Sequence, residues 1–322
     1  MTTAWACDSR VVIVAGKGGV GSSTVAAALA VLAARDGADV LLVAVDGKPG
    51  LGPLLGGEPL TRIEQTLRSI SGAGRVRART IPPAQAFSDY LDLKGVGNIV
   101  RRAASAASLD LVAAATPGLE HLLVLGKIKE LERTRAADLI VVDAPPAGNA
   151  APFLRSASGL RGAVANGPIR DQADEVVAML ADRSRTRALL VTLPEETPVN
   201  EVIELAFDLE EDLGVALAPM VINCCWPDRS ALAMSATSAA RASGVSISIG
   251  DRRALDSSNR FGAARLSVQR EQLERLAAAL PIASIQLPRL PTTRLEPADV
   301  DLLADALAAA PVRSGERPVA AR

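Results

Sequence analysis

The chain has 322 residues, of which 49% are hydrophobic but only 2% aromatic, and its formal net charge is −1. Basic residues are scattered along the chain rather than gathered into runs, which argues against a dedicated nucleic-acid-binding protein. A core of Ala, Val, Leu and Ile instead suits a parallel sheet covered by closely packed helices. One large α/β domain can use most of this length, and we expect it to span residues 1–310.

The first predicted elements lie in the stretch 11–24, VVIVAGKGGVGSST. Apolar residues of high β propensity lead into a glycine-rich turn, and hydroxyl residues then open an Ala-rich helix at 25–34. This order forms a cradle for phosphate, because glycines let backbone N–H groups converge and the helix dipole favours an anion. The loop nearly matches G-x-x-x-x-G-K-[ST], with Gly16 and Gly21 correctly spaced, but Ser22 stands in the place of the lysine.

The rest of the chain alternates between buried strands and helices. Continuous apolar runs predict further strands at 38–45, 75–81, 138–143, 188–193, 215–223 and 282–287. Apolar residues at three-to-four spacing predict helices at 172–183, 198–213, 265–280 and 295–310, and a helical insertion at about 84–136. The alternation predicts an α/β fold with a doubly wound, mostly parallel sheet. Residues 311–322 have the composition of a disordered tail.

The glycines also fit a dinucleotide-binding pattern. Gly16, Gly18 and Gly21 satisfy G-x-G-x-x-G, and Asp46 ends the second predicted strand, where such a fold has its ribose-binding acid. However, the gap from Gly21 to Asp46 exceeds the usual spacing of about 20 residues. The hydroxyl cluster at 22–24 would serve a magnesium-bound phosphate but has no role in a nicotinamide site. A phosphate loop is therefore the favoured interpretation.

Two acids follow predicted strands. Asp143 suits the carboxylate that holds magnesium through water opposite a phosphate loop, although alone it would be read as an ordinary turn-capping aspartate. Asp46 suits either the orientation of an attacking water or the capping of a turn. Both acids depend on the phosphate loop for their functional interpretation.

Several other features favour plain structural roles. Cys7, Cys224 and Cys225 form no C-x-x-C and no disulfide framework, so we expect a reducing compartment and small buried side chains at 224 and 225. No signal-peptide pattern and no apolar run of about 18 residues is present, which predicts a cytoplasmic protein. His121 is expected on the surface or partly packed. A charged helix face at 127–132 is expected to be solvated: Lys127, Lys129, Glu130 and Glu132.

Motifs along the chain resemble the arsenite-pump ATPase family, to which the tail-anchored-protein targeting ATPases belong. They are GKGGVG with its hydroxyls, the strand ending in Asp46, PGLE at 117–120, VVDAPPAG at 141–148, VIN at 221–223 and LPRLP at 287–291. The segments FxxYLD at 87–92 and GKIKE at 126–130 make the chain most similar to the short actinobacterial anion-ATPase subunits. The resemblance implies a P-loop NTPase fold of the SIMIBI class, ATP or ADP with Mg²⁺ as cofactors, and a dimer with nucleotide at its interface.

The resemblance also assigns roles to individual residues. Lys17 matches the signature lysine that reaches the partner's nucleotide phosphates, and Asp46 and Asp143 match the switch I and switch II acids, although Gly47 replaces the proline expected after Asp46. Ser23 and Asp143 are the expected magnesium ligands. The residues expected to contact nucleotide are Gly16, Lys17, Gly18, Gly19, Val20, Gly21, Ser22, Ser23, Thr24, Asn223 (adenine), Pro288 and Leu290.

The sequence also departs from the family pattern. Ser22 removes the charge that grips the β and γ phosphates. Ala147 and Asn149 replace the threonine and histidine of the usual switch II, and no C-x-x-C is present for an interfacial zinc. With only four methionines, a Met-rich groove for hydrophobic clients has little support.

These departures leave three hypotheses open. The leading one is half of a heterodimer, in which a related subunit keeps its loop lysine and Lys17 acts on it in trans. The second is a non-catalytic scaffold or client-binding protein, whose hydrophobic client or membrane partner the sequence does not identify. The third is a slow homodimeric ATPase that compensates for Ser22 with an arginine such as Arg155 or Arg289.

Overall fold

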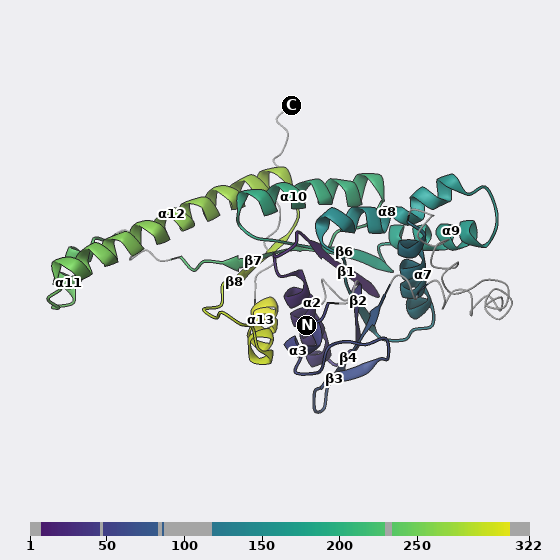
Figure 1. Cartoon of the computed structure of the whole chain (residues 1–322), viewed down its shortest axis with the longest axis horizontal. Helices are drawn as coiled ribbons and strands as arrows, with labels where there is room; N and C mark the ends of the chain where they lie inside the picture. Colours follow the sequence, from purple (N-terminus) through teal and green to yellow (C-terminus); the bar gives the residue numbers. More distant parts are fainter. Residues whose placement is uncertain (1–7, 46–47, 83–85, 87–117, 229–233, 310–322) are drawn as a thin grey trace.

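The computed structural model describes residues 8–45, 48–82, 86, 118–228 and 234–309, and it is built around an eight-stranded sheet (Figure 1). The strand order is β3-β4-β2-β5-β1-β6-β7-β8, and every pairing is parallel except β3 with β4. This confirms the predicted α/β fold with a mostly parallel sheet. The strands are β1 Val11–Gly16, β2 Asp39–Val45, β3 Gln65–Ser69, β4 Arg75–Ile81, β5 Leu139–Asp143, β6 Thr186–Thr192, β7 Met220–Cys225 and β8 Ser284–Pro288.

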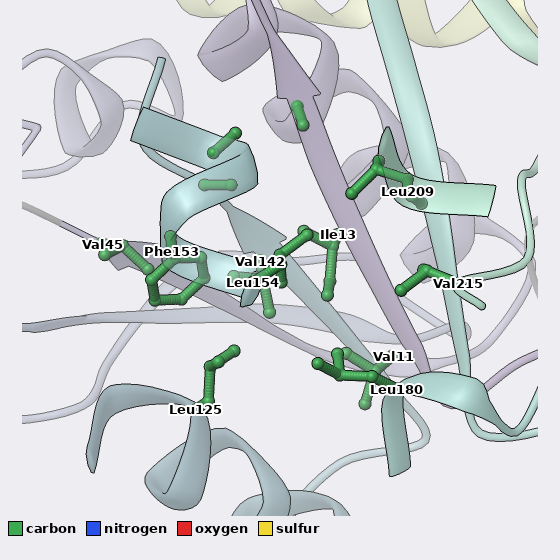
Figure 2. Close-up of a cluster of buried hydrophobic side chains, with 14 of the residues drawn as sticks. Val11, Ile13, Val45, Leu125, Val142, Phe153, Leu154, Leu180, Leu209 and Val215 are labelled. Carbon is green, nitrogen blue, oxygen red and sulfur yellow. The ribbon is translucent and has the colours of Figure 1, made fainter. Parts of the chain in front are cut away.

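Helices cover both faces of the sheet, because each central strand is apolar on both sides. In β1, Val11, Ile13 and Ala15 belong to one hydrophobic cluster, while Val12 and Val14 belong to the other. Figure 2 shows side chains of the first cluster. Its helices are α7 Leu119–Arg133, α8 Ala147–Ala163, α9 Pro168–Ala181 and α10 Glu196–Phe207, the last continued by the π-helical turn Asp208–Asp212. The second cluster is closed by α2 Ser22–Arg35, α3 Leu51–Leu54 and α13 Pro297–Ala309.

Helix α2 fixes the end of the glycine loop. All residues from Thr24 to Ala34 are buried, and most of them are alanines, which let the helix backbone lie close to the sheet and to α13. Because the helix is held along its whole length, its N-terminus stays at the carboxyl edge of β1. Ligands of open α/β sheets bind at this edge, where the strand order reverses.

The longest of the described helices, α12 Ile249–Ala279, begins 16 residues before the helix expected at 265–280. It projects from the body of the molecule and carries α11 Ala236–Ala242 at its far end (Figure 1). The projecting part includes Ile249 and Phe261, which are 65% and 62% exposed. Because this part packs against little of the body, its sequence lacks the apolar periodicity from which helices are predicted.

Other expectations need correction or lie outside the described residues. Strand β3 and helix α8 were not predicted, and β7 begins at Met220 rather than at 215. Helix α7 lies within the stretch expected as a helical insertion, whereas residues 87–117, the tail at 311–322, and Asp46 with Gly47 lie outside the description, so the insertion stays a prediction. The extent of a single domain over 1–310 stays a prediction. Among the described residues, no helix has the length and apolar composition needed to cross a membrane.

The charged face of α7 is not simply solvated, contrary to expectation. Glu132 is 4% exposed and pairs with Arg185 at 2.6 Å and with Arg10 at 3.5 Å. Lys129 is 7% exposed and pairs with Glu175 of α9. The reason is tertiary, because α9 supplies Glu175 to Lys129, while Arg10 before β1 and Arg185 before β6 reach Glu132. As expected, His121 is partly packed, with its ring edge-on to that of Phe153 at a centroid distance of 5.5 Å.

Candidate nucleotide-binding site

Two glycines of the loop are required by the local geometry. A Cβ at Gly16 would lie 2.3 Å from the carbonyl oxygen of Val191, since β1 pairs with β6 at this point. Gly21 has a φ of +88°, and a Cβ there would lie 2.4 Å from Asn223 Nδ2. Only glycine meets both demands without strain. These positions therefore fix the path of the loop before α2 begins.

The start of α2 is left open toward the loop. Gly21 is its N-cap residue, and no side chain caps the helix. The first N–H groups of an α-helix have no intrahelical partner and are commonly satisfied by a capping side chain, by water or by an anion. The hydroxyl oxygen of Ser22 is buried and has no hydrogen-bond partner among the described residues. An uncapped helix end and an unpartnered buried hydroxyl thus meet at one point.

A cavity of about 290 Å³ lies over this point. Loop glycines, the loop hydroxyls and the turn after β5 surround it, a lining that suits a phosphate group. The lining residues are Gly16, Lys17, Gly18, Gly19, Gly21, Ser22, Ser23, Lys48, Ala144 and Pro146. We call it the phosphate cavity.

Asp143 lies beside the phosphate cavity because of the sheet register. It ends β5 between Val14 of β1 and Ala44 of β2, and its side chain is fully buried. Burial raises the pKa of this carboxyl, while the neighbouring charge and hydrogen bond of Lys48 and the hydroxyl of Ser23 oppose the rise. Asp143 Oδ2 has no geometric hydrogen-bond partner among the described residues.

Lys48 is the residue of this site that the sequence analysis missed. Its Nζ donates to Asp143 Oδ1 and to the carbonyl oxygen of Ala144, both at 2.5 Å. It follows β2 rather than the glycine loop, so no loop motif points to it. A weak signal was present, because Lys48 is one of only five lysines and lies two residues after Asp46.

Lys17 lies at the rim of the phosphate cavity. Its Nζ forms an ion pair with Glu201 of α10, and the two side chains are 32% and 35% exposed. The ammonium is therefore directed to a partly exposed acid of its own chain.

A second cavity, also of about 290 Å³, adjoins the first at Gly19 and Gly21, and its lining mixes apolar side chains with polar ones. We call it the base cavity. It contains the predicted residues Val20, Thr24, Asn223, Pro288 and Leu290, with Leu295, Leu303 and threonines of the loop after β8. A glycine-lined compartment that suits phosphate thus meets, at one glycine turn, a compartment lined by leucines together with Asn223 and other polar side chains, and the pair matches the two ends of a nucleotide.

Asn223 links β7 to the glycine loop. Its Nδ2 donates to the carbonyl oxygen of Val20, and its Oδ1 accepts from the backbone N–H of Cys224, both at 2.9 Å. The adenine contact expected of Asn223 stays a prediction. Cys225 is buried as expected, whereas Cys224 is only partly buried and has a φ of 55°.

The arginines expected to compensate for Ser22 do not reach the phosphate cavity. Arg155 pairs with Asp208 and Asp212, on the turn after α10. Arg289 lines the base cavity and lies 4.9 Å from the centroid of the Trp226 ring. Lys48, and not an arginine, supplies the interior cation.

The chain's relationships agree with this site. Residues 9–165, which include the glycine loop and Asp143, match the family model described as "Anion-transporting ATPase". Over this stretch, which is just under half of the chain, the sequence is similar to the anion-transporting ATPase family. The matched region holds every lining residue of the phosphate cavity.

Relatives with the same kind of name are found in several organisms. "ATPase BagA" of Mycobacterium tuberculosis is 35% identical over 221 residues, covering 66% of this chain and 64% of that protein. The "Arsenical pump-driving ATPase" of Escherichia coli is 28% identical over 208 residues, covering 63% of this chain and 33% of that protein. The chain therefore spans less than two thirds of the first protein's length and a third of the second's.

The matched family in general uses a nucleotide with Mg²⁺, and the residues of this site fit these two groups differently. The glycine cradle, the open helix end and the free Ser22 hydroxyl fit a phosphate. The expected metal ligands fit less well, because the ammonium of Lys48 already holds Asp143 Oδ1 and leaves only Oδ2 for a cation. No group of three or more His, Cys, Asp or Glu side chains that could hold a metal lies within the described ranges. The glycine loop and Ser22 thus suit a phosphate, while the charge of Lys48 opposes a divalent cation at Asp143.

Proposed function

We propose that this chain is a nucleotide-binding subunit of an anion-transporting-type ATPase, impaired in hydrolysis at its own site. It pairs with a related subunit that keeps its loop lysine, and it supplies Lys17 in trans to the nucleotide of that subunit. The observation that carries the nucleotide-binding part is the junction of the phosphate and base cavities at Gly19 and Gly21.

The impairment follows from charge. Ser22 gives the loop no cation to stabilise the charge that develops during phosphoryl transfer. The N-terminus of α2 contributes only about 0.3–1 kcal/mol to an exposed anion, which does not replace an ammonium. Asp143, the acid expected to organise the hydrolytic site, is neutralised by Lys48. Nucleotide is therefore held in this site and turned over poorly.

The trans role is supported by the place of Lys17. Its ammonium lies at the cavity rim on a partly exposed acid, so a competing phosphate can draw it away at small cost. A cation supplied in trans to a phosphoryl-transfer site is worth roughly 10³–10⁵ in rate. We thus expect ATP or ADP with Mg²⁺ at the competent site of the dimer. We expect the dimer to be located in the cytoplasm.

A scaffold role is the second candidate, and one observation favours it. The projecting helix α12 exposes Ile249, Leu255 and Phe261, which suits contact with another protein or a hydrophobic client. A scaffold would use this arm without any response to nucleotide.

ATP hydrolysis by the purified chain, alone and mixed with a related subunit that retains its loop lysine, tests the proposal. We expect background rates for the chain alone and a clear increase on mixing, together with a two-subunit mass by light scattering. Equal rates per subunit with and without mixing would instead indicate a homodimeric ATPase. A scaffold would show neither nucleotide binding in a calorimeter nor any effect on the partner's rate.

A further inference from the structure

The phosphate cavity lacks a lysine at position 22, but besides Lys17 at its rim it contains another cation. Ser22 occupies the sequence position of the loop lysine, and its hydroxyl is buried without a partner among the described residues. Lys48 lines the same cavity from the segment after β2, on the side of β5. The positive charge that is missing at position 22 of the glycine loop is thus supplied by Lys48 from another segment of the cavity lining.

The ammonium of Lys48 is only partly engaged by the protein. A lysine ammonium carries three donors. Asp143 Oδ1 and the carbonyl oxygen of Ala144 accept two of them at 2.5 Å. The Lys48 side chain is 20% exposed, so it is not sealed inside the protein. A donor therefore remains for an anion in the cavity.

The contact with Asp143 has a second consequence. Asp143 is the buried acid expected to help hold Mg²⁺, and its Oδ1 is already paired with an ammonium. A divalent cation at this carboxylate would have only the unpartnered Oδ2 to bind, and it would lie next to that positive charge, which opposes it. The ammonium and the metal are therefore alternative counter-charges for Asp143.

We propose that Lys48 is the phosphate-binding cation of this chain's own site, and that nucleotide binding there does not depend on magnesium. The inference rests on the proposed nucleotide binding and adds the residue that replaces the missing loop lysine. The ammonium of Lys48 donates one hydrogen bond to Asp143 and another to a phosphate oxygen.

The plainer alternative is that Lys48 only neutralises a buried acid, since a carboxylate without a counter-charge is costly. The two roles predict different effects on the affinity for nucleotide. A purely structural lysine stabilises the fold and leaves the affinity for nucleotide unchanged. A phosphate-binding lysine changes the affinity, and it does so most clearly when magnesium is absent.

Calorimetric titration of ADP into the full chain, in EDTA and in excess Mg²⁺, separates these roles. We expect wild-type Kd values that agree within about threefold between the two conditions. Lys48→Ala should weaken binding in EDTA by about 10- to 100-fold, the range of a hydrogen bond to a charged group. Lys48→Arg, which keeps the charge, should retain more affinity than Lys48→Ala. Lys127→Ala, at a lysine of α7 that lines neither cavity, should bind like wild type.

A second variant serves as the control for a loss of stability. If Lys48→Ala melts at a much lower temperature, the double variant Lys48→Ala/Asp143→Asn removes the uncompensated buried charge. We expect it to recover thermal stability while its affinity for ADP in EDTA stays low. Recovery of affinity along with stability would show that Lys48 acts only through the fold.

Two further outcomes overturn the inference in distinguishable ways. Wild-type binding that needs Mg²⁺, or equal affinities of wild type and Lys48→Ala in EDTA, would refute it and leave the proposed nucleotide binding in place. No binding of ADP by the wild-type chain in either condition would refute both.

Discussion

The ammonium of Lys17 forms an ion pair with the carboxylate of Glu201, which joins the glycine loop to α10 at the rim of the phosphate cavity. About a third of each side chain is exposed. Pairs of this kind contribute roughly 0–1 kcal/mol, because water screens them and two long side chains must be ordered. The pair therefore positions Lys17 without locking it.

Glu201→Gln should release Lys17 with little effect on the fold. We expect the free energy of unfolding to fall by less than about 1 kcal/mol, measured by urea denaturation. In the mixed dimer the rate of ATP hydrolysis should stay the same or rise, because the lysine no longer has to leave an acid. Glu204→Gln, at an exposed acid of the same helix, is the matched control. A large drop in rate for Glu201→Gln alone would mean that the acid itself takes part in the reaction.

Gly21→Ala should destabilise the chain and damage the loop. Its φ of +88° and the 2.4 Å approach to Asn223 Nδ2 leave no room for a methyl group. We expect a loss of roughly 1–3 kcal/mol, the usual cost of a residue in a sparsely populated backbone region. Gly159→Ala is the control, because Gly159 lies inside α8 with no neighbour within 4 Å of an added Cβ. That change should stabilise the chain by about 0.5–1 kcal/mol. Thermal melts of both variants test this, and a Gly21→Ala variant that melts as high as Gly159→Ala would contradict the expectation.

Arg185→Met should destabilise the fold through Glu132. The carboxylate of Glu132 is 5% exposed, and Arg185 holds it at 2.6 Å. Only the longer 3.5 Å pair with Arg10 would remain in the described structure. We expect a loss of about 2–3 kcal/mol, below the range for a fully unpaired buried charge. Arg133→Met removes an exposed pair with Glu130 and should lower stability by less than about 1 kcal/mol in the same denaturation assay. Similar losses for both variants would count against a special role of the buried acid.

Asp39 should make stability depend on pH in the acid range. Burial alone would raise the pKa of its carboxyl, but hydrogen bonds and charges of Arg75 and Arg77 outweigh it and hold the pKa below its ordinary value. Because the pKa is lower in the folded state, the ionised carboxyl stabilises the fold at pH values above the unfolded-state pKa of about 3.9. This stabilisation is lost as the pH falls from there through the folded-state pKa. Asp39→Asn should therefore be less stable than wild type at pH 7 by roughly 1 kcal/mol.

Urea denaturation at several pH values tests this dependence. The difference between wild type and Asp39→Asn should stay constant down to about pH 5 and shrink below about pH 4. Asp228→Asn, at an exposed acid, should match wild type throughout. A difference that grows toward low pH would contradict the assignment.

Local sequence predicts the centre of this fold well and its margins poorly. Strands such as Val11–Gly16 and Leu139–Asp143 are continuous apolar runs, because both faces of a central parallel strand are buried. β3, with the sequence QTLRS, is an antiparallel edge strand of partly exposed polar residues and has no such signal. Helix α8 contains Pro152 and several glycines, which obscure its helical pattern.

The glycine cradle could be predicted, whereas its cation could not. Gly16, Gly21 and Ser22 lie in one local motif whose spacing reflects loop geometry. Lys48 reaches the cavity only because the segment after β2 folds against the end of β5, a contact 95 residues apart along the chain. For the same reason the burial of Glu132 was missed, since it depends on Arg10 and Arg185 from distant segments.

The rate of ATP hydrolysis by the mixed dimer carrying Lys17→Ala in this chain tests the central claim most directly. The wild-type mixture and a Lys127→Ala mixture are measured beside it, with dimer formation verified by light scattering. We predict that Lys17→Ala lowers kcat by roughly 10³-fold or more, as expected when a cation supplied in trans is lost. An unchanged kcat in a fully formed Lys17→Ala dimer would contradict the claim that Lys17 completes the partner's site.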